Sequence, residues 1–221
     1  WLMEKMGHRE GLGNVLAEGV KIAAEKLGGD AKKYAMHVKG LELPGYDPRG
    51  AKGIGLNYAT ASRGADHNDG WTIAVELFGM PQQVDRFSED ANKAKWVVEF
   101  QDSTAAPIDS AVFCDFCLDF GFSPEVIERL MREATGMKRS YADMVRVGER
   151  IVNIERLFNT REGYSRKDDV LPDRFLEPMP DGNSKGHTFD VNRMLDDYYN
   201  MRGWNQQGVP TPEKLKSLGL A

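Results

Sequence analysis

The chain has 221 residues, which is long enough to bury one large hydrophobic core or two small ones. Its net charge of −5 gives no electrostatic reason to bind nucleic acid or an anionic membrane surface. No apolar run approaches the roughly 20 residues that cross a bilayer. Two cysteines cannot form the disulfide framework of a small secreted domain, so we expect a cytoplasmic protein.

Apolar residues recur at helical spacing along most of the chain. The sequence therefore predicts a mainly α fold in which no sheet has more than about three strands. The first residues, which begin with Trp rather than Met, resemble the end of an amphipathic helix, and we expect the chain to be part of a longer polypeptide. A short strand or extended arm is expected over 34–43. Helices are predicted over residues 12–27, 51–62, 84–106 (ending at Pro107), 124–135, 140–160, 190–199 and 212–218.

The helix predicted over 140–160 has the most regular pattern, and Ser140 is suited to cap it. We expect it to be central and to bury the apolar side chains of one face: Met144, Val147, Ile151, Ile154 and Phe158. Its arginines are expected to form a solvated face, with a partner surface as the alternative: Arg146, Arg150, Arg156 and Arg161. After this helix, turn formers and charges over 164–188 predict a long surface arm, anchored by residues 171–175.

Two segments carry residues suited to chemistry. The segment 109–117 holds both cysteines and the carboxylate of Asp109, so it could bind a ligand's polar edge and a metal at one place. The alternative is two cysteines buried as small apolar groups. In the loop 63–71, we expect His67 to be the one side chain that exchanges a proton near neutral pH. The alternative for this loop is an ordinary solvated surface.

Five stretches in chain order carry a likeness to one family: residues 12–20 (LGNVLAEGV), 39–50 (KGLELPGYDPRG), 57–67 (NYATASRGADH), 197–204 (DYYNMRGW) and 208–215 (GVPTPEKL). Together they resemble the C-terminal helical region of the tungsten-containing aldehyde ferredoxin oxidoreductases. The resemblance implies a multi-helical fold. It also implies that residues 1–50 end a middle helical domain and that residues 51–221 form a C-terminal helical domain.

Members of that family bind a tungsten (or molybdenum) bis-pterin cofactor between an N-terminal β domain and two helical domains, with a 4Fe-4S cluster close by. They oxidise aldehydes to carboxylic acids and pass two electrons to ferredoxin. The resemblance therefore implies three partners for this chain: ferredoxin, a small aldehyde and the missing N-terminal part of the same polypeptide.

One family motif has the form Asp-x-x-Gly-Leu-Cys, in which the Asp contacts a pterin and the Cys is the last cluster ligand. The matching residues here are Asp109 and Cys114, with Val-Phe in place of Gly-Leu at 112–113. The resemblance also makes His67 a catalytic residue that would position water or the aldehyde oxygen, or accept a proton. Cys117 would be a bystander. Because an all-cysteine cubane needs four thiolates, three would come from an earlier part of the polypeptide.

Two other hypotheses stay open. A family member with another substrate, such as an aromatic acyl-CoA ring reductase, would use the same cofactor. A binding or assembly module would have kept the scaffold and lost the chemistry, which Val-Phe at 112–113 favours. For the isolated chain we expect no tungsten-pterin, no 4Fe-4S cluster and no activity, and we expect self-association, as in a homodimer, through apolar patches.

Overall fold

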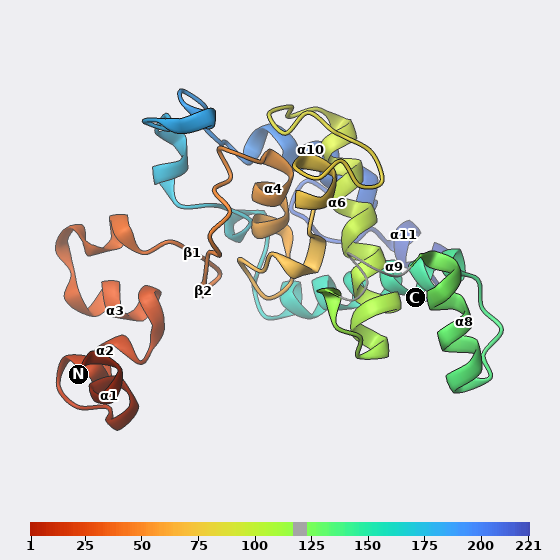
Figure 1. Ribbon diagram of the computed structural model, residues 1–221, viewed down its shortest axis with the longest axis horizontal. Coiled ribbons are helices and arrows are strands. Elements are labelled where there is room, and N and C mark those ends of the chain that lie inside the picture. The colour runs from red at the N-terminus through yellow and green to blue at the C-terminus, as the bar shows by residue number, and fades with distance from the viewer. Residues whose placement is uncertain (117–122) are drawn as a thin grey trace.

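The computed structural model describes residues 1–116 and 123–221. Within them the chain is mainly helical, which confirms the predicted class, and its strands β1 (His37–Val38) and β2 (Leu41–Glu42) pair in one antiparallel sheet. In this described part, no helix is both long and apolar enough to cross a membrane. The α-helices of the described part, all but α5 labelled in Figure 1, are α1 (Leu2–His8), α2 (Leu12–Leu16), α3 (Gly19–Leu27), α4 (Lys52–Thr60), α5 (Ile73–Glu76), α6 (Ala91–Ser103), α8 (Pro124–Thr135), α9 (Tyr141–Arg161), α10 (Asn192–Arg202) and α11 (Pro212–Ser217).

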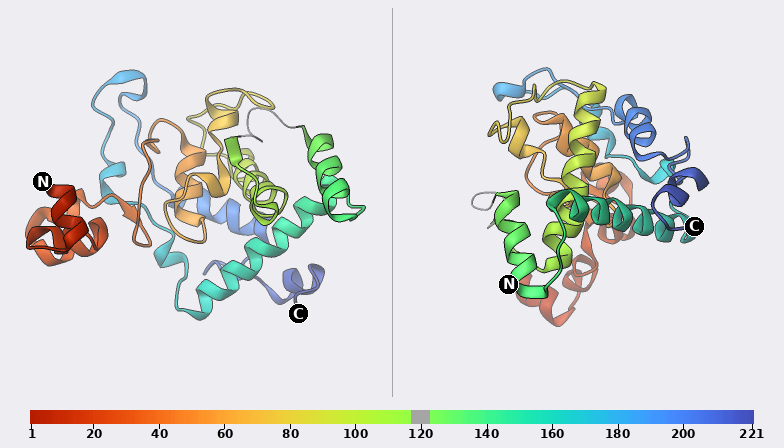
Figure 2. Two further views of the ribbon diagram at one scale, coloured as in Figure 1. Left: turned by 60° about the horizontal axis from the view of Figure 1, so that its bottom comes forward. Right: turned by 90° about the vertical axis from the view of Figure 1, so that its right-hand side faces the viewer.

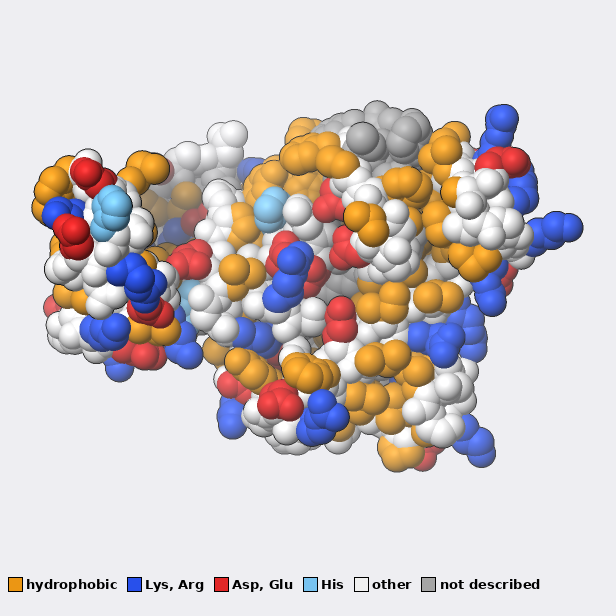
Figure 3. Space-filling view, turned by 90° about the horizontal axis from the view of Figure 1, so that it is seen from below, with side chains coloured by type: hydrophobic (Ala, Val, Ile, Leu, Met, Phe, Trp, Pro, Cys, Tyr) orange, Lys and Arg blue, Asp and Glu red, His pale blue; other side chains and the backbone are white. Residues whose placement is uncertain are grey.

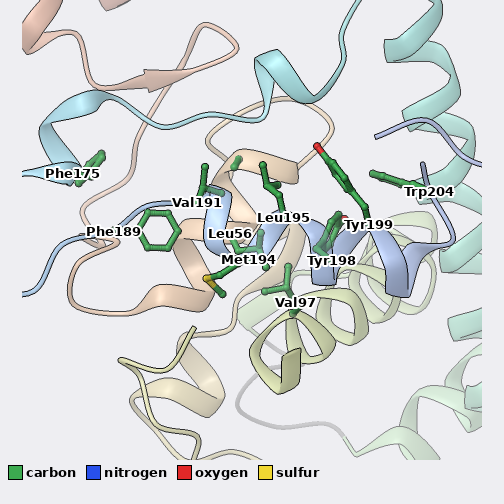
Figure 4. Close-up of a cluster of buried hydrophobic side chains, with 12 residues drawn as sticks. Leu56, Val97, Phe175, Phe189, Val191, Met194, Leu195, Tyr198, Tyr199 and Trp204 are labelled. Carbon is green, nitrogen blue, oxygen red and sulfur yellow. The ribbon is translucent and has the colours of Figure 1, made fainter. Parts of the chain in front are cut away.

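Helices α4, α6, α9 and α10 pack together and form the body of the molecule (Figures 1 and 2). Helices α1 to α3 lie to one side, beyond the β1–β2 hairpin. Figure 4 shows the main core, in which side chains of α4, α6 and α10 interdigitate, among them Leu56, Val97 and Leu195. Burying each such side chain contributes roughly 1.5–3 kcal/mol. This core fixes the ends of α4 and α6, where the two candidate site segments begin.

The helix predicted over 12–27 is two helices rather than one. Helix α2 ends at Leu16, and α3 starts at Gly19, which has a φ of +83°. A helix cannot continue through that backbone conformation, and glycine is the residue that adopts it without strain. Gly13 lets α2 pack closely against α1, because a Cβ there would lie 2.3 Å from the backbone of Lys5 on α1. Helices α1 and α2 therefore pack backbone against backbone.

The helix predicted over 84–106 starts later and ends differently. Its first residue is Ala91, because the side chain of Asp90 caps it by accepting from the N–H of Lys93 at 3.2 Å. Pro107 does not end it. The α-helix passes into a π-helical turn, η3 (Thr104–Ile108), which contains Pro107, and then into a 3₁₀ turn, η4 (Asp109–Ala111). A proline cannot donate to the helical ladder, and the wider turn accommodates it.

The predicted length of α9 is confirmed, but the predicted buried face is wrong. Of the five apolar residues expected to be buried, only Met144 is; Val147 and Ile151 are half-buried. Ile154 and Phe158 are 50% and 54% exposed. The apolar stripe therefore faces outward along much of the helix.

The face of α9 that packs on the body carries Gly148, Asn153 and Arg156. A Cβ on Gly148 would lie 1.8 Å from the carbonyl oxygen of Asp102, so only glycine allows this approach of α6. The amide oxygen of Asn153 accepts a hydrogen bond from the indole of Trp204 at 2.8 Å. Polar groups can be buried here because each one has a partner.

Arg156 was expected on a solvated face, yet it is buried and paired. It donates two hydrogen bonds to Asp169 of the arm, at 2.9 and 2.7 Å. Asp169 also accepts from the hydroxyl of Tyr199 and forms an ion pair with Lys39, which follows β1 in the hairpin. We call Lys39, Arg156 and Asp169 the buried charge triad. It ties the hairpin, α9 and the start of the arm together.

The arm over 164–188 runs in short 3₁₀ turns: η5 (Arg166–Asp168), η6 (Asp173–Leu176) and η7 (Gly182–Ser184). Its predicted anchor is present, since Phe175 is buried in the main core. The guanidinium of Arg49 lies 5.5 Å from the ring of Phe175 and donates to the carbonyl of Glu177 at 3.1 Å. The arm is therefore held at both its start and its middle.

Candidate functional site

The first site segment follows α4 and is held by its backbone. Gly64 has a φ of +115°, and a Cβ there would lie 2.3 Å from the carbonyl oxygen of Val38, so only glycine lets this loop pass the hairpin. The side-chain amide of Asn57 donates to the carbonyl of Asp66 at 2.8 Å. The carboxylate of Asp66 in turn accepts from the N–H of Asn68 at 2.7 Å. These contacts give the loop a fixed shape.

His67 occupies the middle of this loop and is half-buried. Its ring centroid lies 5.8 Å from that of Tyr46, and it precedes the 3₁₀ turn η2 (Asn68–Gly70). His67 is therefore only partly exposed to solvent.

Arg63 gathers carboxylates around the loop. Its guanidinium pairs with Asp66 and lies 3.4 Å from Asp69. Burial raises the pKa of Asp69 to about 7; the carboxylates of Asp66 and Glu155 add to this, and Arg63 opposes it. His67 is therefore not alone in the loop as a group suited to exchanging a proton near neutral pH, contrary to the sequence-based expectation.

The second site segment follows α6. After η3 and η4 the chain turns at Val112, whose φ of +58° is left-handed. The N–H of Val112 donates to the carbonyl of Asp109 at 3.0 Å, and the N–H of Phe113 donates to that of Ile108 at 3.1 Å. This pair of bonds is the Schellman arrangement, which favours glycine at the position that Val112 holds. Val112 therefore adopts the left-handed conformation that glycine usually supplies in this kind of turn.

Asp109 and Asp115 lie close enough to the first loop for its charges to shift their pKa values. Asp109 is exposed, but partial loss of water raises its pKa; Arg63 lowers it and Asp66 raises it further. The pKa of Asp115 is raised by burial and by Asp109, and His67 opposes that rise. Asp109 and His67 both shift the pKa of Asp115, so the structure places them on the same side of the molecule.

Cys114 is a free, exposed thiol, so the alternative of a buried apolar cysteine is wrong for this residue. Cys117 lies outside the described residues. Among residues 1–116 and 123–221, no three His, Cys, Asp or Glu side chains are grouped so as to hold a metal ion. Cys114 therefore offers one ligand position and no complete site.

A cavity of about 620 Å³ opens between the end of α4, the turn η3 and α9. We call it the acidic cavity, because three carboxylates line it: Asp69, Asp109 and Glu155. Arg63 and Arg156 also line it, but each is already paired with a carboxylate. In Figure 3, acidic side chains gather around basic ones in the middle of one face, with apolar side chains beside them.

Sequence reasoning missed Asp69 and Glu155. A signal for Glu155 was present, since Glu155 and Asn159 follow Ile151 at intervals of four on α9 and so share its face. The side chain of Asn159 donates to the carbonyl of Ser62 at 2.7 Å, which joins α9 to the loop.

The fold defines a class first. It is similar to a chain of the BamBC active-site complex of benzoyl coenzyme A reductase, with a TM-score of 0.69 and 21% identity; the match covers 99% of this chain and 38% of that one. The chain thus shares its helical fold with part of that longer chain.

The sequence then gives the family. The profile described as aldehyde ferredoxin oxidoreductase, domains 2 & 3, matches residues 1–220, and the chain belongs to this family. It is 45% identical over its whole length to the tungsten-containing aldehyde ferredoxin oxidoreductase of Pyrococcus furiosus and 46% identical to that of Pyrococcus horikoshii. It is 30% identical to the WOR-like subunit of an aliphatic sulfonate oxidoreductase of Pyrococcus furiosus. The chain spans 36% of the length of the two aldehyde relatives.

Proposed function

We propose that the chain is the helical portion of a tungsten-pterin oxidoreductase that oxidises aldehydes to carboxylic acids. The observation that carries this proposal is the match over the whole chain, at 45% and 46% identity, to relatives named for aldehydes, against 30% for the relative named for sulfonates. The likeness to the benzoyl coenzyme A reductase chain, at 21% identity, supports the fold alone.

In the proposed reaction, one aldehyde and one water become one carboxylate, three protons and two electrons. When bound, the tungsten-pterin group would supply the acceptor for the two electrons, which would then leave through a 4Fe-4S cluster to ferredoxin. His67 would hold the water or the aldehyde oxygen and accept one proton, as a positioned base does. Asp69, two residues further along the loop, would be a second proton acceptor, since its pKa is about 7.

The residues present fit the implied cofactors in part. A pterin presents N–H donors along its pyrimidine edge, and Asp109, on the wall of the acidic cavity, offers carboxylate oxygens that accept such bonds. The exposed thiol of Cys114 suits an iron ligand. The chain holds only two cysteines, so at least two further ligands of an all-cysteine cubane would come from outside it, in the rest of the longer polypeptide.

The turn at Val112 favours the hypothesis of an enzyme over that of a binding or assembly module that has lost the chemistry. The family motif has glycine at this position, and Val112 adopts the left-handed conformation that glycine would adopt. The path of the backbone from Asp109 to Cys114 is therefore compatible with the motif although the residue has changed.

The charge of the acidic cavity favours aldehydes over acyl-CoA esters. Asp109 and Glu155 line a space in which both arginines are already paired, and Asp69 adds negative charge as pH rises through its pKa of about 7. A coenzyme A ester carries several phosphate charges, and like charges at close range disfavour binding. An uncharged aldehyde meets no such repulsion.

The wider setting belongs to the same proposal. Residues 1–50 would close a middle helical domain and residues 51–221 would form the C-terminal one. We place the protein in the cytoplasm, with ferredoxin as electron acceptor. Exposed apolar side chains such as Ile154 and Phe158 would be covered by the rest of the polypeptide or by a second copy.

The full-length protein tests the proposal. It should contain tungsten and iron and should reduce a redox dye when an aldehyde is added. His67→Ala should keep both metals and lose roughly 10²–10⁴-fold in turnover. His187→Ala is the matched control, because His187 stacks on Phe87 at 3.7 Å in the arm, outside the site. Reduction of benzoyl coenzyme A without aldehyde oxidation, or a metal-free full-length protein, would contradict the proposal.

A pH series separates the two proton acceptors. If Asp69 takes the proton, the pH–rate profile of Asp69→Asn should lose its limb near pH 7, whereas that of His67→Ala should keep it. The reverse result would assign the proton to His67.

A further inference from the structure

A chain of buried polar side chains runs from α10 through α6 and α4 to the loop that carries His67. At one end lies Arg202, whose guanidinium donates to the side-chain oxygen of Gln101 at 2.7 Å. The side-chain nitrogen of Gln101 donates to the side-chain oxygen of Asn57 at 2.9 Å. The side-chain nitrogen of Asn57 then donates to the carbonyl of Asp66 at 2.8 Å. We call Arg202, Gln101 and Asn57 the hydrogen-bond chain.

The hydrogen-bond chain has little freedom to rearrange. All three of its side chains are buried. Gln101 makes the four hydrogen bonds that its amide can make, because Tyr198 also donates to its oxygen, at 2.6 Å, and its nitrogen also donates to Thr60, at 3.2 Å. A buried amide that loses a partner costs free energy, so the satisfied arrangement is strongly favoured.

Arg202 sets the direction of the chain. A guanidinium has donors and no acceptor, so the oxygen of the Gln101 amide must face α10 and its nitrogen must face α4. The oxygen of the Asn57 amide then faces Gln101, and its nitrogen is left to face the loop. Arg202 is itself held by an ion pair with Asp102, at 2.5 Å. The donor offered to the loop is therefore fixed from the far side of the core.

The loop meets the hydrogen-bond chain at two points, one on each side of His67 and Asp69. The first is the carbonyl that accepts from Asn57, in the residue before His67. The second is Gly70, where a Cβ would lie 2.6 Å from the side-chain oxygen of Asn57 and 2.9 Å from the Cγ of Gln101. Glycine is required for so close an approach. The hydrogen-bond chain thus sets the positions of His67 and Asp69 from both sides.

Resting on the aldehyde oxidation proposed above, we propose that Gln101 and Asn57 are positioning residues that hold the two proton acceptors, His67 and Asp69, in place for the reaction. Among the described residues, Asn57 is fully buried and is not part of the wall of the acidic cavity, so its effect on the reaction comes through the loop. A misplacement of about 1 Å at a reacting centre can cost about 10²-fold in rate. The hydrogen-bond chain therefore governs turnover although it lies behind the site.

Two variants break the hydrogen-bond chain at different links. Gln101→Met keeps the length of the side chain and removes the donor to Asn57. Asn57→Leu keeps the shape of the side chain and removes the donor to the loop. In the full-length, metal-loaded protein, each should lower kcat for an aldehyde by roughly 10²-fold, keep tungsten and iron, and change KM little. The variant with both changes should lose about as much as either alone, because one broken link already frees the loop.

Hydrogen exchange of the full-length protein reports on the loop without the reaction. The backbone amides of residues 64–70 should exchange roughly tenfold faster in both variants, because a hydrogen bond that holds the loop is lost, and those of α9 should keep their wild-type exchange. Gln83→Met is the matched control, since the Gln83 amide also donates to backbone carbonyls, those of Val75 and Glu76 at 3.1 and 2.9 Å, at the end of α5. It should leave both kcat and the exchange of residues 64–70 unchanged.

The outcomes separate the two proposals. A loaded wild type that oxidises no aldehyde overturns the proposed function, and the exchange measurement still decides whether the hydrogen-bond chain holds the loop. If the wild type oxidises aldehydes and the variants keep its kcat or its exchange over residues 64–70, the positioning role is wrong and the function stands. Exchange that rises as much in α9 as in the loop also overturns the positioning role, since the two side chains would then be structural only.

A folding failure of one variant leaves the test intact. If Gln101→Met does not fold, Asn57→Leu carries the same test, because it breaks the same chain and leaves Arg202 and Tyr198 with their acceptor.

Discussion

Replacing Asp169 by Asn should strongly destabilise the protein, because Asp169 is the only carboxylate in the buried charge triad. Asp169 is fully buried and balances Lys39, whose ammonium is 2.9 Å away, and Arg156, which donates two hydrogen bonds. Asn keeps the volume and one acceptor oxygen but leaves two buried cations without a counter-ion. Removing one partner of a buried ion pair costs about 3–5 kcal/mol. We expect a loss in that range.

The assay is denaturant unfolding of the full-length protein, followed by circular dichroism, with wild type and variant measured side by side. Asp173→Asn is the control, since Asp173 is exposed on the same arm and its change should stay within about 0.5 kcal/mol. Adding Lys39→Met to Asp169→Asn removes one of the two unpaired cations and should restore part of the loss. A loss below about 1 kcal/mol for Asp169→Asn, or no restoration in the double variant, would refute the reasoning.

The triad also sets a pH dependence. Burial alone would raise the pKa of Asp169, but Lys39 and Arg156 outweigh it and hold the pKa below its usual value. A depressed pKa in the folded state gives stability that is present above the unfolded pKa of about 3.9 and lost as pH falls through the folded one. The wild type should therefore lose this contribution in strong acid, and Asp169→Asn should not show that part of the loss.

Four further predictions follow from the site. The raised pKa of Asp69, about 7, means that the folded state holds a proton there more tightly than the unfolded state does. Its contribution to stability is complete below about pH 4 and is lost as pH rises through about 7, so Asp69→Asn should flatten the fall of unfolding free energy between those values. Val112→Gly should stabilise the protein by up to about 1 kcal/mol in denaturant unfolding, because it relieves left-handed strain at a side chain that is 89% exposed; Val112→Ala should bring little of that gain. Cys114→Ser in the full-length protein should lower the iron content, because a hydroxyl is a poorer ligand for iron than a thiolate, and unchanged iron would end the ligand assignment. The 221-residue chain purified alone should contain neither tungsten nor iron, and stoichiometric tungsten by elemental analysis would contradict this.

Periodicity predicted the helices of the body well and their buried faces less well. The pattern on α9 located a helix of the right length, since apolar spacing and a capping serine are local features. It could not show that Asn153 and Arg156 face inward, because their partners, Trp204 and Asp169, lie 51 and 13 residues away in sequence. A polar side chain can be buried only where its hydrogen-bonding partner lies close in space. The spacing of apolar residues along a helix does not indicate where that partner is.

The candidate site divides in the same way. His67, Asp109 and Cys114 were found through the resemblance to a family, and the structure places His67 and Asp109 on one side, near Asp115. The raised pKa of Asp69 could not be found in the sequence, because it arises mainly from burial, with smaller contributions from Asp66 in the same loop and from Glu155 on α9. A loop rich in Asp is predicted to be solvated, because the sequence does not show which elements pack around it.

The π-helical turn between Thr104 and Ile108 sets the angular phase between α6 and the segment that follows it. Each residue advances an α-helix by about 100°, so a turn that takes in one extra residue rotates everything after it by about that angle. If residues 104–108 were wound as ordinary α-helix, Asp109 would point about 100° away from its present direction, with the rest of the helix unchanged. The direction in which Asp109 projects is thus determined by the winding of one turn. Deleting one residue from that turn would redirect the second site segment while α6 itself kept its contacts.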